Sequence, residues 1–136
     1  MKHAMLFVLA ALPFVVLSAN TSTASTNVQR EITTAISNAN YVNDAKYVKQ
    51  AHLYLQHVVN CLVGTRSDEF VANAGDPCIG AGRGAINDYK GDKLDKALLT
   101  RALQDAEYGL VTNNIQIAQS AANLSKKSLQ EARQTL

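Results

Sequence analysis

The sequence contains no tryptophan, only two cysteines and no run of basic residues. Its 13 Lys and Arg residues are almost balanced by 11 Asp and Glu residues, which leaves a formal net charge of +2. Proteins that bind nucleic acids or anionic membrane surfaces concentrate their basic residues in a patch or a run. The composition therefore argues against both kinds of partner.

The chain also lacks an apolar segment long enough to span a membrane, which requires about 20 residues in a helix. The longest charge-free apolar run covers residues 4–17, follows Lys2 and precedes a stretch of small residues. This order is typical of a secretory signal peptide. We predict that residues 1–24 are a signal peptide, cleaved before Ser25 or after Ala19, and that an uncleaved anchor is the alternative. The mature chain, residues 25–136, is then periplasmic or secreted and has no transmembrane segment.

The alternation of apolar and polar residues that is typical of a half-buried strand does not occur, and two regions show helical spacing instead. Apolar residues recur about every 3.5 residues from Val28 to Leu62, and again from Leu94 to Ala132. The pattern predicts an all-α fold in one domain, residues 25–136. With breaks near Asn40 and Asn113 the regions give four helices in an up-and-down bundle. Without breaks they give a long helical hairpin that dimerises through its exposed apolar seams.

Four residues mark the expected helix ends. Thr26 and Gln29 have the spacing of a capping box at the start of the first helical region. Gly64 is suited to a C-terminal cap, because glycine adopts the left-handed conformation without strain. Asp92 is an N-cap candidate for the second helical region.

Between these regions, residues 64–91 contain six of the seven glycines, together with Pro77, and are predicted to form a loop. So long a connection inside a compact domain needs a tether. Cys61 and Cys78 are the only cysteines, and two cysteines in an exported chain predict a disulfide bond. The bond would stabilise the fold by roughly 3 kcal/mol. A thiol-redox pair is the alternative, but such pairs are usually separated by two residues.

A metal site is the second interpretation of the same region. His57 and Cys61 are four residues apart and share a helix face, so His57, Cys61 and Cys78 could ligate copper or zinc if the thiols were reduced. His52 lies about 140° around the helix from His57, which prevents the two histidines from holding one ion on an unbroken helix. The preferred prediction is therefore no metal and no cofactor.

No nucleophile is paired with a base in the sequence, so no catalytic residue and no enzymatic activity are predicted. Binding residues concentrate on irregular loops carried by rigid scaffolds, which makes Phe70, Arg83, Asp88 and Tyr89 the candidate contact residues. We predict an exported, non-enzymatic binding or assembly protein that acts through its helical faces and the Cys61–Cys78 loop. Its partner would be another envelope or secreted protein, or a second copy in a homodimer. The alternatives are a small periplasmic metal-binding protein that uses His57 with His52 or carboxylates, and a thiol-redox protein.

Overall fold

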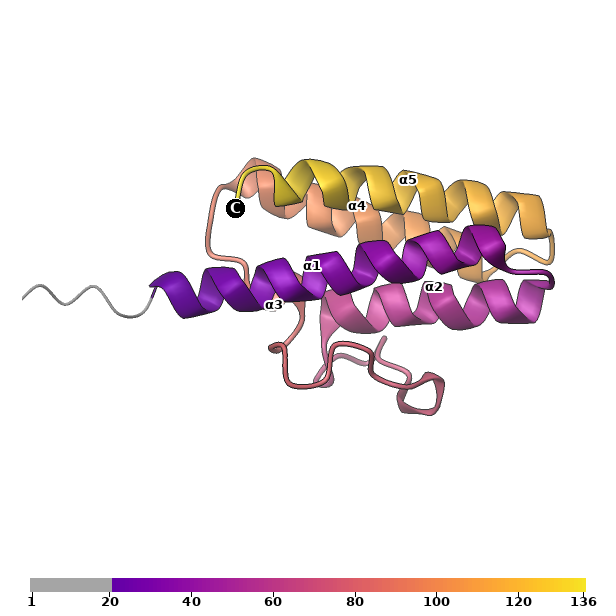
Figure 1. Cartoon of the computed structure of the whole chain (residues 1–136), viewed down its shortest axis with the longest axis horizontal. Coiled ribbons are helices and arrows are strands. Elements are labelled where there is room, and N and C mark those ends of the chain that lie inside the picture. Colours follow the sequence, from indigo (N-terminus) through magenta and orange to yellow (C-terminus); the bar gives the residue numbers. More distant parts are fainter. Residues whose placement is uncertain (1–20) are drawn as a thin grey trace, which may run out of the picture.

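The computed structural model describes residues 21–136, which form an all-α, up-and-down bundle of four long helices (Figure 1). The long helices are α1 (Thr21–Asp44), α2 (Val48–Val63), α4 (Lys93–Leu110) and α5 (Ile115–Arg133). The connection between α2 and α4 contains a 3-10 turn, η1 (Ala72–Ala74), and a one-turn helix, α3 (Ala85–Asp88). No strand occurs within residues 21–136, so the predicted fold class is confirmed.

The four long helices form a ring in which α1 packs against α2 and α5, and α4 packs against the same two helices. The two short connections, α1 to α2 and α4 to α5, lie at one end of the bundle, on the right in Figure 1. The long connection leaves the other end and folds back along the outside of α2 (Figure 1). The loop therefore lies along the side of the bundle.

Small side chains bring the helices close together. The buried faces combine a few large residues with many alanines, which allows dense packing at short interhelical distances. The buried alanines of the long helices are Ala35, Ala39, Ala51, Ala102, Ala106, Ala118, Ala121, Ala122 and Ala132. Gly109 continues this pattern, because a Cβ atom there would lie 2.7 Å from a methyl group of Leu55. No helix among residues 21–136 is both long and apolar enough to cross a membrane.

The first helix extends beyond both of its predicted ends, and the break expected near Asn40 lies a few residues later, between Asp44 and Val48. The structure begins α1 at Thr21, before the expected capping box at Thr26, and carries it past Asn40 to Asp44. Asn38 shows why the asparagines do not end the helix, because its side chain donates to the carbonyl oxygen of Thr34 one turn earlier. With no Gly or Pro in this segment, the helix continues. The signal-peptide prediction falls mainly on residues 1–20, outside the described residues.

The other predicted ends are confirmed. Gly64 ends α2 with φ of 73°, and the Asp92 side chain accepts from the backbone N–H of Leu94 at the start of α4. The break expected near Asn113 lies between Leu110 and Ile115. Asn114 caps α5 there, since its side-chain oxygen accepts from two backbone N–H groups of the first turn.

Candidate functional site

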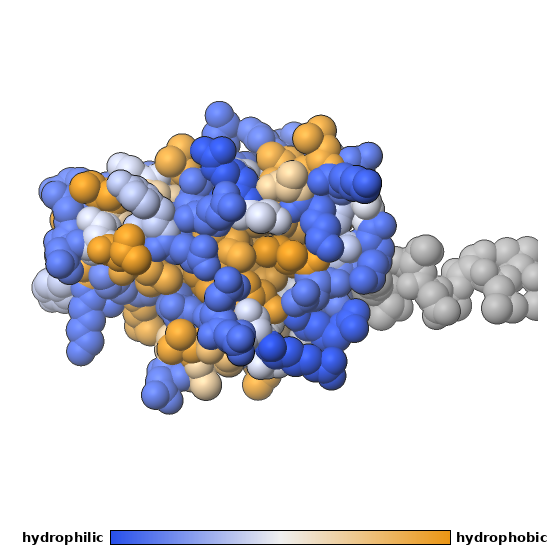
Figure 2. Space-filling view, turned by 180° about the vertical axis from the view of Figure 1, so that it is seen from behind, coloured by the Kyte–Doolittle hydropathy of each residue, from blue (hydrophilic) through white to orange (hydrophobic). Residues whose placement is uncertain are grey.

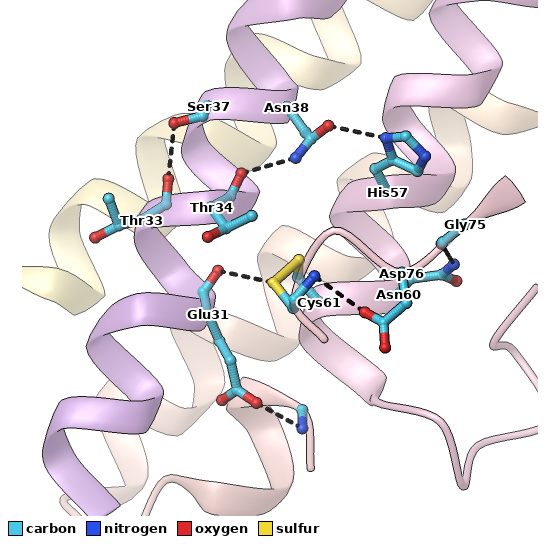
Figure 3. The surroundings of a disulfide bond; sticks show 12 residues. Glu31, Thr33, Thr34, Ser37, Asn38, His57, Asn60, Cys61, Gly75 and Asp76 are labelled. Atoms are coloured by element: carbon cyan, nitrogen blue, oxygen red, sulfur yellow. Dashed lines mark hydrogen bonds between the residues drawn. A yellow bond between two sulfur atoms is a disulfide. The ribbon is translucent and has the colours of Figure 1, made fainter. Parts of the chain in front are cut away.

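A disulfide bond joins the last turn of α2 to the long loop. Cys61 and Cys78 are bonded, both are buried, and their Cα atoms are 5.3 Å apart (Figure 3). The sulfur of Cys78 lies 3.8 Å from the carbonyl oxygen of Glu31, so the bond packs against α1 as well. Asp76 orders the chain just before Cys78, because its carboxylate accepts a hydrogen bond from the backbone N–H of Cys78 across Pro77. The predicted disulfide is confirmed.

Asn60, the neighbour of Cys61, is a second anchor for the loop. Its side chain is buried on α2, donates to the carbonyl oxygens of Val71 and Gly75, and accepts from the backbone N–H of Val71. Gln56 donates to the same amide oxygen. A buried amide is stable only when its polar atoms are paired, and here the loop backbone supplies most of the partners. The side chain therefore fixes residues 71–75 against α2.

His57 is a third anchor, one turn before Cys61. One ring nitrogen lies 3.0 Å from the side-chain oxygen of Asn38 on α1 (Figure 3). The other lies 2.6 Å from the carbonyl oxygen of Ala74. The ring of Tyr54 packs edge-on against the imidazole at 6.1 Å. His57 thus connects α1, α2 and the loop, and both of its nitrogens face oxygen atoms.

Glu31 of α1 reaches the far end of the loop. The side chain is only 1 % exposed, and one carboxyl oxygen accepts from the backbone N–H of Gly84 at 2.9 Å (Figure 3). The other carboxyl oxygen is buried and makes no hydrogen bond with residues 21–136. The pKa of Glu31 is raised to about 7, chiefly by burial and also by the nearby carboxylates of Asp88 and Asp76, while the hydrogen bond from the Gly84 N–H opposes the shift.

Glycine is required where the loop returns to the bundle. A Cβ atom on Gly64 would overlap the carbonyl group of Arg83, and one on Gly84 would overlap the backbone of Val63 and Gly64. Both glycines also have positive φ, 73° and 101°. At Gly82, a Cβ atom would overlap the Asp88 carboxylate. Two backbone segments therefore cross in direct contact at the end of α2.

Arg83 is held in place by Asp88. The buried Asp88 carboxylate accepts from the backbone N–H of Arg83 at 2.7 Å and from its Nε at 2.8 Å. The side chain of Arg83 is nevertheless 60 % exposed. Asp88 therefore holds the guanidinium group through its Nε, and most of the Arg83 side chain stays exposed.

This arginine borders a cleft of about 540 Å³ between the end of α2, the loop and α4. Val63, Ile86 and Leu103 are its apolar residues, and Arg66 and Lys90 lie at its edge together with Arg83. Val63 and Leu103 are buried core residues, whereas the basic side chains belong to exposed residues of the loop. The cleft thus combines an apolar floor with a basic edge.

The polar residues of the cleft are already ordered. Asn87 donates to the carbonyl oxygen of Val63 at 2.8 Å, which attaches α3 to the end of α2. Lys90 donates to the carbonyl oxygen of Asn87. Ser67 is the only hydroxyl residue in the lining, and its oxygen is engaged in a local turn with Glu69. Neither a histidine nor a cysteine lines the cleft.

The four residues predicted to make binding contacts have different positions. Arg83 lines the cleft, and Asp88 lies behind it as the partner of the guanidinium group. Phe70 is half-buried and packs against the core. Tyr89 is buried and donates to Asp95 at 2.8 Å; burial and this carboxylate raise the pKa of its phenol. Only Arg83 of the four therefore lies at the cleft, and a contact role for any of them stays a prediction.

The alternative metal site is not assembled in this form of the chain. The sulfur atoms of Cys61 and Cys78 are bonded to each other, and no group of three or more His, Cys, Asp or Glu side chains within residues 21–136 is placed to hold an ion. His57 is used in hydrogen bonds, and His52 lies 2.8 Å from the carbonyl oxygen of Thr112.

A separate apolar groove of about 560 Å³ lies between the first half of α2, η1 and the end of α4. It includes Leu53, Val71 and Leu110. Figure 2 shows the back of the molecule, where apolar residues gather in the middle of the face and hydrophilic residues surround them. Apolar side chains are thus exposed on the bundle as well as in the loop.

Sequence reasoning missed Glu31, Asn60 and Arg66, although two of them have a sequence signal. Glu31 lies three residues after Val28 and four before Ala35, which places a carboxylate on the buried face of a helix. Asn60 interrupts the apolar run 58–63. Both are polar residues at core positions, which points to specific partners. Arg66 has no such signal.

Comparisons of the chain with protein-family models, with curated proteins and with solved structures find no match.

Proposed function

We propose that this chain is an exported, non-enzymatic binding protein that holds its ligand in the cleft bounded by Val63, Arg83 and Leu103. The observation that carries the proposal is that Asp88 holds Arg83 in place beside an apolar floor, while the terminal amino groups of Arg83 make no hydrogen bond with residues 21–136. Rigid placement of polar groups reduces the entropy that binding must overcome. Apolar pockets with a few oriented polar groups are the usual form of ligand sites.

Two further observations support this proposal. The only lining hydroxyl, Ser67, has Glu69 as its partner and no histidine beside it, which favours binding over catalysis. The Cys61–Cys78 bond and the signal-like residues 1–24 favour an oxidising compartment outside the cytosol.

The test is a fragment screen of the isotope-labelled protein by NMR. Fragments that bind should shift the backbone amide signals of Ser67, Arg83 and Asn87. Binding should weaken when the chain carries Cys61→Ser together with Cys78→Ser, because the loop then loses its tether. Arg101→Ala, on the exposed side of α4, is the control and should bind the same fragments. Shifts confined to other surfaces, or equal binding by the double serine variant, would contradict the proposal.

A further inference from the structure

The basic edge of the cleft has hydrogen-bond donors that the chain itself does not use. Arg66 makes no hydrogen bond or ion pair with any residue in the described part of the chain. Arg83 uses its backbone N–H and its Nε on Asp88, and its terminal amino groups make no hydrogen bond there either. Planar guanidinium groups of this kind bind carboxylates through two parallel hydrogen bonds.

The charges around the cleft leave an excess of one positive charge. Its lining has three basic residues, Arg66, Arg83 and Lys90, and one acidic residue, Glu69. Asp88 neutralises one of the three cations from behind. A ligand with a single negative charge therefore balances the site, whereas a dianion does not.

The position of Glu69 indicates which basic residues of the cleft are left to bind an anionic group. Its carboxylate accepts from Ser67 and lies close enough to Glu107 to raise the pKa of that half-buried side chain, although burial is the larger cause. Glu69 is thus the acidic residue of the lining, and Glu107 on α4 lies outside the lining. Arg66 and Arg83 are the donors left for an anionic group, and the apolar floor lies below them.

We infer that the cleft binds a monocarboxylate that carries an apolar group, with the carboxylate between Arg66 and Arg83 and the apolar group on Val63, Ile86 and Leu103. The inference rests on the proposed function, since it names the chemical class of the ligand. A cleft of about 540 Å³ is within the usual range for small organic ligands. A free aliphatic acid and the carboxyl terminus of a peptide share this chemistry, and the experiment separates them.

The experiment titrates the oxidised protein with matched probes and follows the amide signals of Ser67, Arg83 and Asn87 by NMR. The probes are octanoate, its neutral analogue octanamide, the cation octylamine, and a tripeptide ending in Leu-Phe with a free or an amidated carboxyl terminus. We expect a carboxylate probe to bind at least about tenfold more tightly than its amide, because hydrogen bonds to charged groups exceed those to neutral ones by that order. Preference for octanoate indicates a free acid, and preference for the free peptide indicates a chain terminus.

Two arginine variants test whether Arg66 contacts the carboxylate of the ligand. Arg66→Ala should weaken carboxylate binding at least about tenfold and bring it near the affinity of the amide. Arg101→Ala removes a different exposed arginine and should leave binding unchanged. Because Arg66 has no partner in the described chain, its removal should not change the unfolding midpoint, which is measured in parallel.

The outcomes separate the inference from the proposed function. Octanamide that binds in the cleft as tightly as octanoate would overturn the carboxylate class and leave the site in place. Equal carboxylate binding by Arg66→Ala would overturn the assigned contact. If no probe shifts the cleft signals at millimolar concentration while fragments of another class do, the inference fails and the proposed function stands.

Discussion

Glu31 places a carboxyl group in the core beside a second one, that of Asp88. In the folded protein its pKa of about 7 lies above the ordinary value of 4.5, so folding favours the protonated form. The stability that this group contributes is complete below pH 4.5, declines as the pH rises through 7, and is absent above that. The shift corresponds to roughly 3 kcal/mol of unfolding free energy.

Glu31→Gln should remove this pH dependence. The amide oxygen can still accept from Gly84, and the side chain no longer ionises. We expect the variant to match the wild type near pH 4.5 and to exceed its unfolding free energy at pH 8 by up to roughly 3 kcal/mol. Urea unfolding at several pH values measures the difference between the two proteins. Parallel curves from pH 4.5 to 8 would show that Glu31 is not the group responsible.

Asn60 is expected to be the most sensitive polar residue of α2. Replacing it with alanine removes the donor of the Gly75 carbonyl oxygen and the acceptor of the Val71 N–H, at a cost of roughly 2–4 kcal/mol of unfolding free energy. Urea unfolding measures the loss. Amide hydrogen exchange should show that residues 71–75 lose protection first. The exposed Asn113 provides the control, since Asn113→Ala should change neither quantity.

For single residues, the sequence predicts those whose role follows from their own chemistry. It misses those whose role depends on contacts with backbone segments far away in the sequence. Cys61 and Cys78 pair because no other cysteine exists. Arg66 and Arg83 come together only because the loop crosses itself at Gly64 and Gly84, a contact that spacing does not reveal. The sequence therefore suggests Arg83 as a candidate contact residue, a role that stays a prediction, and offers no reason to choose Arg66.

Among the structural elements, the loop depends most on its covalent tether. Cys61→Ser together with Cys78→Ser should lower the unfolding free energy by roughly 2–4 kcal/mol, because the unfolded chain gains entropy when the ring is opened. Far-ultraviolet circular dichroism should change little, since the long helices pack against one another without the loop. Thiol titration of the freshly isolated wild-type protein should detect no free cysteine. Two alkylated cysteines before reduction would contradict the assignment.

The spacing of apolar residues predicts the long helices, but it predicts their ends less well. Asp92 caps α4 as expected, and Asn114 caps α5 beside the break expected near Asn113, because each has a side-chain oxygen beside free N–H groups. Asn40 looked equally suitable, yet α1 continues past it. The difference is tertiary, because α1 packs on both α2 and α5 along its length and this burial outweighs the weak helix propensity of asparagine. The one-turn helix α3 is too short to leave a periodic signal.

For the molecule as a whole, the closed ring of four helices predicts a monomer. Each long helix already buries its apolar face within the chain, so the seam that would have paired two hairpins is not available. Sedimentation equilibrium of the purified protein should give the mass of one chain. A stable dimer would instead implicate the groove at Leu53 and Val71, and Leu53→Glu should then dissociate it.

The bond between Cys61 and Cys78 also makes the intervening residues part of a covalent ring. A protease that cuts once after the exposed Arg66 opens the ring but does not divide the molecule, because the disulfide still joins the two pieces. On a denaturing gel without reductant the nicked protein should run as a single band that contains both pieces. With reductant it should separate into an N-terminal piece with α1 and α2 and a C-terminal piece with α4 and α5. A cut in the loop therefore leaves the two pieces joined until an electron donor reduces the disulfide.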